Sequence, residues 1–381
     1  MISKYFIILK KELKFDRRNK VSYIVALLSM FLFIGRPCSA QERNYLDYHQ
    51  QSVLIEGHLL GGSDDSTILS QFKNLFDEYK PFAREAFVAL QIACRQKDEN
   101  VLEYFFRKAF LSGISKAHCQ LFALTRTEWT SEHGFNLTAL YDSCRAYYLS
   151  LLDLKLRAQI YKNQRKDDSV KYHLKHPVTL EEKEQFLDKK NVLRKKYFGG
   201  FVKVTEDNIL FVMDVSKKLG YVPFERTIGI LDNSIEQDTQ IRKTAGNVQF
   251  YPLILQAFMH HGYGFFNLKK ELIKSLKMGE LHPRCYAFIY DYAVNYYRDV
   301  WYMSAASNFG QYTNLKITDS LEDYPNQYRI VQLETWDKLK SESFIDACRR
   351  QIGICSRSQD RQAIDYEKRT GIKLRFGFFE Y

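Results

Sequence analysis

The chain has 381 residues and a formal net charge of +11, with 45% hydrophobic and 27% charged residues. A chain of this length can bury its own core and does not depend on disulfides or a metal to fold. Residues 1–40 hold eight basic and two acidic side chains, which leaves only about +5 on the remaining 341 residues. This low charge density argues against nucleic acid as a partner.

The first element is an apolar run at residues 21–35, which follows a basic segment and precedes small residues at Cys38 and Ala40. As a helix, this run would span about 22 Å, less than the roughly 30 Å of hydrocarbon in a bilayer. The pattern is typical of a signal peptide at residues 1–40, cleaved before Gln41. It predicts an exported protein, periplasmic or extracellular. The basic segment before the apolar run is long for a cleaved signal, so an inner-membrane anchor through residues 21–35 is the alternative. A membrane is expected as a partner only in that case.

Beyond residue 40 the sequence predicts an all-α fold. Prolines occur where helices are expected to begin, because the first helical turn tolerates a missing N–H; they are Pro81, Pro252 and Pro283. Glycines occur where helices are expected to end, at Gly113, Gly220, Gly279, Gly353 and Gly371. Residues 179–182 have the Thr-x-x-Glu form of a capping box. The alternating residues 372–376 are the best candidate for a strand, or for an extended segment packed on the helices.

The helices are expected to fall into two halves. Residues 41–165 are predicted to form an N-terminal region of helical hairpins. In this region Leu102, Phe106 and Ala109 are spaced as in the second helix of a tetratricopeptide unit, which the segment resembles. No clear second copy follows, and a solenoid needs about three units, so we predict a repeat-like hairpin only. The charged stretch 166–177 is the predicted linker, and residues 178–381 the predicted compact α-helical domain.

Six cysteines follow the predicted cleavage site, and none forms a Cys-x-x-Cys motif: Cys94, Cys119, Cys144, Cys285, Cys348 and Cys355. An even number permits disulfides in an oxidising compartment, and buried free thiols are an equal alternative. On one continuous helix Cys348 and Cys355 would be about 10 Å apart, too far for a bridge. A helix that ends at Gly353 would bring the pair within reach, so the pairing stays open.

The densest group of candidate catalytic residues is His260-His261, with Asp291 as the best local candidate for an orienting carboxylate. Adjacent helical histidines point about 100° apart, and no histidine lies at the i,i+4 spacing of a helical metal pair. We therefore predict no metal and no cofactor. One of the two histidines, oriented by Asp291, could act as a general base. Burial or helix capping is the competing interpretation, and His282 before Pro283 is expected in a loop or cap.

A series of short segments in residues 200–356 resembles an uncharacterised bacterial domain family, a domain of unknown function found in exported proteins. The segments, in order, are Asp207-Asn208, Gly220 to Pro223, Gly229, His260-His261, Gly279 to Pro283, Tyr286-Ala287, Asp291, Phe309-Gly310 and Arg349 to Ile354. The resemblance implies an α-helical domain and no established activity. This chain has Tyr292 where the family has Arg, and Gln311-Tyr312 where it has Thr-Gln. If those positions belong to an active site, this member has lost it.

Two functional hypotheses follow. The first is a non-enzymatic scaffold or binding protein of the cell envelope, which holds a protein or peptide partner. The second is a hydrolase that uses His260 or His261 with Asp291. No nucleophile elbow, P-loop or dinucleotide-binding motif occurs in the sequence, which favours the first hypothesis.

Overall fold

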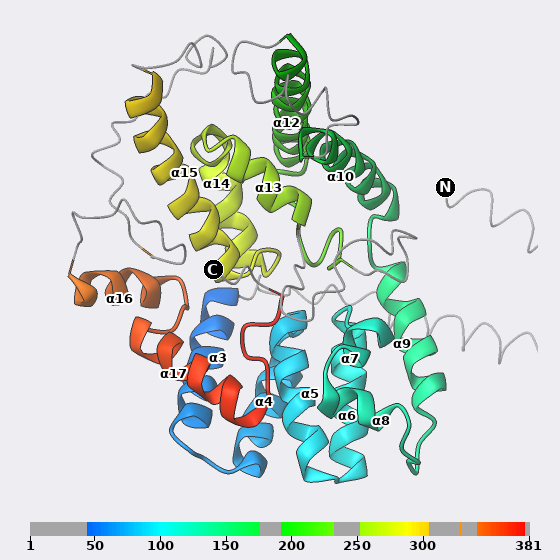
Figure 1. Cartoon of the computed structure of the whole chain (residues 1–381). Helices are drawn as coiled ribbons and strands as arrows, with labels where there is room; N and C mark the ends of the chain where they lie inside the picture. Colours follow the sequence, from blue (N-terminus) through cyan, green and yellow to red (C-terminus); the bar gives the residue numbers. More distant parts are fainter. Residues whose placement is uncertain (1–43, 176–191, 232–251, 305–327, 329–340, 378–381) are drawn as a thin grey trace, which may run out of the picture. The chain divides into compact units, whose positions relative to one another are not determined.

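The computed structural model describes residues 44–175, 192–231, 252–304, 328 and 341–377. Within these ranges every regular element is an α-helix, which confirms the all-α prediction. The helices are α3 Tyr45–Leu60, α4 Asp65–Glu78, α5 Ala83–Gln96, α6 Glu99–Leu111, α7 Lys116–Gln120, α8 Ala123–Glu128, α9 Leu137–Ser150, α10 Leu154–Lys175, α12 Val192–Leu219, α13 Pro252–His260, α14 Tyr263–Met278, α15 Pro283–Ser304, α16 Glu342–Gln351 and α17 Arg357–Thr370 (Figure 1).

Several predicted features lie outside the described residues: the leader with its apolar run at 21–35, the capping box at 179–182, and the segment Phe309 to Tyr312 of the family resemblance. Among the helices that are described, none combines the length and the apolar character needed to cross a bilayer.

Proline and glycine mark helix boundaries much as predicted. Helices α13 and α15 begin at Pro252 and Pro283. Helices α12, α14 and α17 are each followed directly by a glycine with positive φ, at Gly220 (74°), Gly279 (77°) and Gly371 (75°). A side chain at these positions would clash with the backbone, whereas glycine adopts this conformation without cost and ends the helix.

The first helices pack in chain order, α3 on α4, α4 on α5, α5 on α6, and α6 on α9. The apolar face predicted from Leu102, Phe106 and Ala109 is buried in this stack, where Phe72 and Phe87 lie fully inside the core. Several helices begin with a side-chain cap, such as the Asp98 carboxylate, which accepts hydrogen bonds from the first-turn amides of α6.

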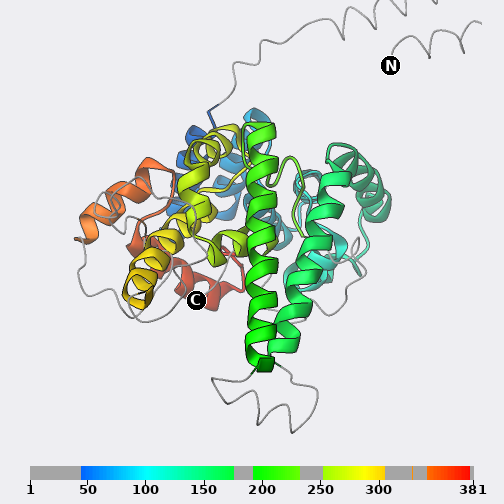
Figure 2. The same ribbon diagram turned by 90° about the horizontal axis from the view of Figure 1, so that it is seen from above.

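The predicted linker at 166–177 is helical as far as Lys175, where α10 ends. Residues 166–175 contain no glycine or proline to interrupt the helix. Helix α10 packs side by side with α12, as both views show (Figures 1 and 2). The run of charges here therefore lies within a helix as far as Lys175.

Helices from the two predicted halves are in contact. In the later half, α12 packs on α13 and α14, and α15 packs on both of these. Helix α3, from the first half, contacts α14 and α17. The chain from Asn44 onward accordingly groups as one unit.

Residues 372–376 pack on the helices, as in the second of the two predicted alternatives, but residues 374–376 form a turn rather than an extended segment. Ile372 and Leu374 are fully buried. The side-chain amide of Gln91 on α5 accepts a hydrogen bond from Lys373 N at 2.8 Å and donates one to Lys373 O at 3.3 Å. One glutamine thereby satisfies both backbone groups of a tail residue, as a neighbouring strand would.

All six cysteines after the predicted cleavage site are buried free thiols. Cys348 lies on α16, which ends at Gln351, and the chain turns at Gly353 (φ 76°) before Cys355. The turn that the sequence allowed is therefore present, but the two sulfurs are not bonded.

Candidate functional site

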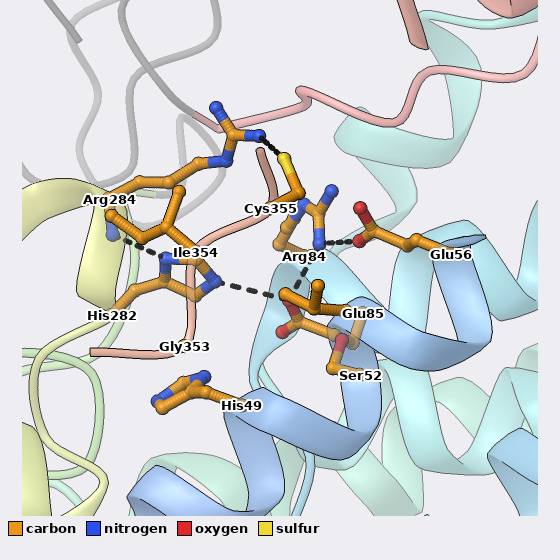
Figure 3. A pocket seen from close by; sticks show the side chains of 11 residues that line it. His49, Ser52, Glu56, Arg84, Glu85, His282, Arg284, Gly353, Ile354 and Cys355 are labelled. Atoms are coloured by element: carbon orange, nitrogen blue, oxygen red, sulfur yellow. Dashed lines mark hydrogen bonds and ion pairs between the residues drawn. The ribbon is translucent and has the colours of Figure 1, made fainter. Parts of the chain in front are cut away.

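A small cavity of about 10 Å³ lies among helices α3 and α5, the start of α15 and the turn between α16 and α17 (Figure 3). Buried polar side chains line most of it. The lining residues are His49, Ser52, Val53, Glu56, Arg84, Glu85, His282, Arg284, Gly353, Ile354 and Cys355. This concentration of titratable groups makes the cavity the first candidate for a functional site.

Helix α3 supplies three polar residues because of its periodicity. His49, Ser52 and Glu56 are spaced i, i+3 and i+7, which places them on one helix face. All three are buried, with 1%, 2% and 4% of their surfaces exposed. A polar face turned inward requires polar partners, and α5 provides them.

Helix α5 presents Arg84 and Glu85 from its first turn. Phe82, at the N-cap, offers no side-chain cap. The first amides are instead satisfied by distant side chains: Phe82 N donates to Tyr48 Oη at 3.2 Å, and Ala83 N donates to Glu225. The negative charge of Glu85 also suits the positive end of the helix dipole. The helix start is thus held in place by residues from two other parts of the chain.

Glu85 and His282 form the central hydrogen bond of the cluster, with 3.1 Å between Oε1 and Nε2. Arg284 N donates to the other ring nitrogen, Nδ1, also at 3.1 Å. Because Nδ1 accepts this bond, the ring proton lies on Nε2 and is donated to Glu85. Both nitrogens of His282 are therefore engaged within the protein.

Arg84 joins three segments of the chain. Its guanidinium donates to Glu56, to Glu85 Oε1 at 2.9 Å and to Leu374 O at 2.7 Å. Burial would lower the pKa of Arg84, but the two carboxylates outweigh it and raise the pKa above its ordinary value. The arginine stays charged inside the protein because its partners surround it.

The pKa values of Glu85 and His282 are both lower than usual, for different reasons. Burial acts to raise the pKa of Glu85, but His282 and Arg84 favour the carboxylate and bring the pKa well below its normal range. For His282, burial is the largest influence and lowers the pKa, and Glu85 only partly opposes it. At neutral pH the pair is an ionised carboxylate and a neutral imidazole.

A second set of charges adjoins the first through Arg284. Arg284 and Arg349 both pair with Asp360 on α17, and Arg284 also donates to Cys355 Sγ at 3.1 Å. Arg349 Nε donates to Cys355 O at 2.7 Å. Burial, with the neighbouring Arg284, lowers the pKa of Arg349 to about 10, so it remains cationic at neutral pH.

The formal charges of this connected cluster cancel, because three arginines face three carboxylates. The arginines are Arg84, Arg284 and Arg349, and the carboxylates are Glu56, Glu85 and Asp360. Such a set of buried, mutually hydrogen-bonded charges holds the segments that carry them in one arrangement. Removing one member leaves the charge of its partner uncompensated inside the protein. The cavity beside it is too small for a metabolite. The geometry supports a structural joint.

The predicted catalytic residues lie elsewhere. His260 ends α13, and its ring meets that of Phe201 edge-on with centroids 5.2 Å apart. His261 Nε2 lies 3.0 Å from Thr205 Oγ1, and burial together with His260 lowers the pKa of His261 to about 4.

Asp291 is fully buried in α15, where its carboxylate accepts a hydrogen bond from Tyr328 N at 3.3 Å. The contacts described for Asp291 and for the two histidines are therefore to other residues, and the predicted catalytic group stays a prediction.

His282 occupies the capping position that the sequence suggested, since its ring accepts from the backbone of α15. Its partners were not predictable, because Glu85 is 197 residues away and no local pattern connects the two. In the described ranges, no group of three or more His, Cys, Asp or Glu side chains could hold a metal ion.

Comparison with known proteins adds no assignment. No protein-family model matches the chain, and neither the curated proteins nor the solved structures include a significant match.

Proposed function

We propose that this protein is a non-enzymatic helical scaffold of the cell envelope that binds a protein or peptide partner through an apolar surface. The observation that carries the proposal is a group of exposed apolar side chains where α9 meets α10. Tyr147, Leu151 and Leu154 lie within eight residues and are 59%, 45% and 48% exposed. Large apolar side chains gathered at one exposed corner are typical of protein contacts.

The surface is anchored to a rigid part of the fold. Between the exposed residues, Tyr148 and Leu152 point inward and are buried. Tyr148 Oη accepts a hydrogen bond from Ile230 N at 3.1 Å, and Asp153 N donates to Thr227 O at 2.8 Å. These bonds hold the corner in one geometry, which lowers the entropy cost of binding.

The buried polar cluster supports a scaffold more than a hydrolase. Both ring nitrogens of His282 are engaged, and the adjoining cavity of about 10 Å³ has no room for a substrate. A hydrolase that uses His260 or His261 with Asp291 remains the alternative hypothesis, and the described contacts of these residues, to Phe201, Thr205 and Tyr328, do not favour it over the scaffold.

The proposed surface can be tested by affinity capture from an envelope extract of the producing cell, followed by mass spectrometry. The bait is the wild-type protein or the double variant Leu151→Arg, Leu154→Arg. The matched control is Leu54→Arg on α3, where the leucine is 62% exposed but belongs to a different face. We expect a specific set of captured proteins that the double variant loses and the Leu54 variant retains. Equal capture by all three baits would refute the proposed surface.

The partner can then be tested directly. A purified captured protein, or a peptide from it, should bind the wild-type chain in calorimetry with a negative heat-capacity change, as burial of apolar surface requires. The Tyr147→Glu variant should weaken this binding at least tenfold, because it places a charge in the contact. Unchanged affinity in that variant would show that the partner binds another part of the surface.

A further inference from the structure

Two polar atoms on α3 lack a hydrogen-bond partner among the described residues. They are His49 Nε2 and Ser52 Oγ. Their residues are 1% and 2% exposed, and both line the cavity described above. Figure 3 shows Ser52 beside Glu85, and His49 below His282, whose ring centroid is 5.1 Å from that of His49. Buried polar atoms in folded proteins are almost always paired, so two unpaired atoms at one cavity indicate a ligand there.

We propose that the cavity is an internal binding site for a single water molecule, which bridges His49 Nε2 and Ser52 Oγ. The volume supports this assignment. The cavity measures about 10 Å³. This is about the space that one water molecule needs, and it is too small for a larger molecule.

The charge of the lining favours a neutral ligand. Glu56 and Glu85 are balanced by Arg84 and Arg284, each of which is paired within the protein. Neither sign is left in excess to hold an ion. Nor do the described residues provide three metal-ligating side chains at this place.

The hydrogen-bonding capacities also match. A neutral imidazole has one donor and one acceptor nitrogen, and a serine hydroxyl both donates and accepts. Water can complement either tautomer of His49 and either orientation of Ser52. It would satisfy both atoms at once and link α3 to the charged cluster through the lining carboxylates. A buried water commonly makes about three such bonds.

The first test is a crystal structure of the full chain at a resolution that shows ordered waters. We expect a density peak at hydrogen-bond distance, roughly 2.7–3.2 Å, from both His49 Nε2 and Ser52 Oγ. A dry cavity would overturn the proposal. So would an anomalous signal at this position after a bromide soak, because it would show an anion site.

Variants make the test specific. Ser52→Ala should remove the density peak, because one of the two bridged atoms is lost. The matched control is Ser112→Ala, since Ser112 is equally buried but its hydroxyl already donates to Pro81 O and Lys108 O. This control should retain the water at His49. Persistence of the peak in Ser52→Ala would contradict a bridging water.

Stability measurements provide a second readout in solution. If one water serves both side chains, either substitution releases it. Introduced into the wild-type protein, Ser52→Ala should then clearly lower the urea midpoint. Introduced into a His49→Phe variant, which has already lost the water, the same substitution should lower the midpoint much less. Ser112→Ala should lower both midpoints by the same amount. Additive shifts for Ser52 and His49 would show that the two residues share no ligand.

Discussion

His282 at the start of α15 donates a hydrogen bond to Glu85 in the first turn of α5, across 3.1 Å and 197 residues of sequence. Glu85 also accepts from Arg84 at 2.9 Å and from Tyr48 Oη at 3.4 Å. One carboxylate is thus held by three side chains from three places in the chain.

The first prediction concerns Glu85. Substitution Glu85→Gln should lower the free energy of unfolding by about 3 kcal/mol, because it leaves Arg84 with less compensation inside the protein. The matched control is Glu103→Gln on the surface of α6, where the carboxylate pairs with Arg107 at i,i+4 and the change should cost about 0.5 kcal/mol. Urea denaturation monitored by circular dichroism measures both. Equal losses of unfolding free energy in the two variants would show that the buried cluster stabilises the fold no more than a surface ion pair does.

The second prediction compares two glycines with nearly the same backbone. Gly353 has φ 76° and Gly371 has φ 75°, but a Cβ atom at Gly353 would lie 2.5 Å from His49 Cβ, and one at Gly371 would meet nothing within 4 Å. Gly371→Ala should cost about 1 kcal/mol from backbone strain alone. Gly353→Ala should cost about 2 kcal/mol more, because α3 must shift. Similar thermal midpoints for the two variants would contradict close packing of the turn on His49.

The third prediction is a loss of stability in acid. Burial lowers the pKa of His49, His282 and His261, the last to about 4. Because the unfolded histidines bind protons near their ordinary pKa of about 6.5, stability is unaffected above that pH and falls as the pH drops below it. Glu85, with its pKa below normal, contributes stability above about pH 4.5 that is lost at still lower pH.

Urea midpoints measured from pH 7.5 to pH 4 test this dependence. The variant His261→Gln should flatten the slope between pH 6.5 and pH 4 by an amount equivalent to about 1–2 kcal/mol at pH 5. His58→Gln is the matched control, because His58 lies at an exposed position and pairs with Gln71. A slope that both variants leave unchanged would place the acid sensitivity in other groups.

The fourth prediction is that the six buried thiols are unreactive in the native protein. Burial raises the pKa of Cys119 to about 12 and also raises those of Cys94 and Cys285. The thiolate is the reactive form, so a maleimide at pH 7.5 should label none of them over minutes. With Cys38→Ser in place, all six should react in urea. Incomplete labelling in urea, with a mass lower by two hydrogens per bridge, would reveal disulfides.

The fifth prediction concerns the N-terminus. N-terminal sequencing of the protein recovered from producing cells should begin at Gln41, as expected for a cleaved export signal. The variant Ala40→Arg, which replaces the small residue before the predicted cleavage site, should accumulate as the uncleaved chain. If the wild-type protein instead begins at Met1, the alternative is supported, an anchor through residues 21–35.

Local sequence patterns predicted much of the fold because they act over a few residues. Pro252, Pro283 and the glycines after α12, α14 and α17 mark helix ends through backbone geometry alone. The interpretation of 166–177 as a linker depended on composition, whereas α10 continues to Lys175, because residues 166–175 contain no proline or glycine to end the helix. For residues 372–376, alternation alone could not separate a strand from a packed tail. The contact with Gln91 depends on tertiary structure.

The buried cluster could not be predicted for the same reason. Glu85 looks in the sequence like an ordinary acidic residue in a first helical turn. Arg84 looks like a surface residue, although it is 4% exposed. His260 and His261 drew attention because they are adjacent, yet α13 ends at His260, and the two rings contact different residues, Phe201 and Thr205. The polar contacts of the buried cluster join residues that are far apart in the chain.

The bond from Arg84 to Leu374 O spans 290 residues, which has a consequence for how the chain is made. Helices α3 to α6 can form early in synthesis, but the buried guanidinium lacks this partner until residue 374 has left the ribosome. At about 5–20 residues per second, roughly 15 to 60 seconds separate the two events. During that interval the nascent chain exposes an incomplete core. A partner that holds unfolded chains would have its longest opportunity to bind this protein before its last residues appear.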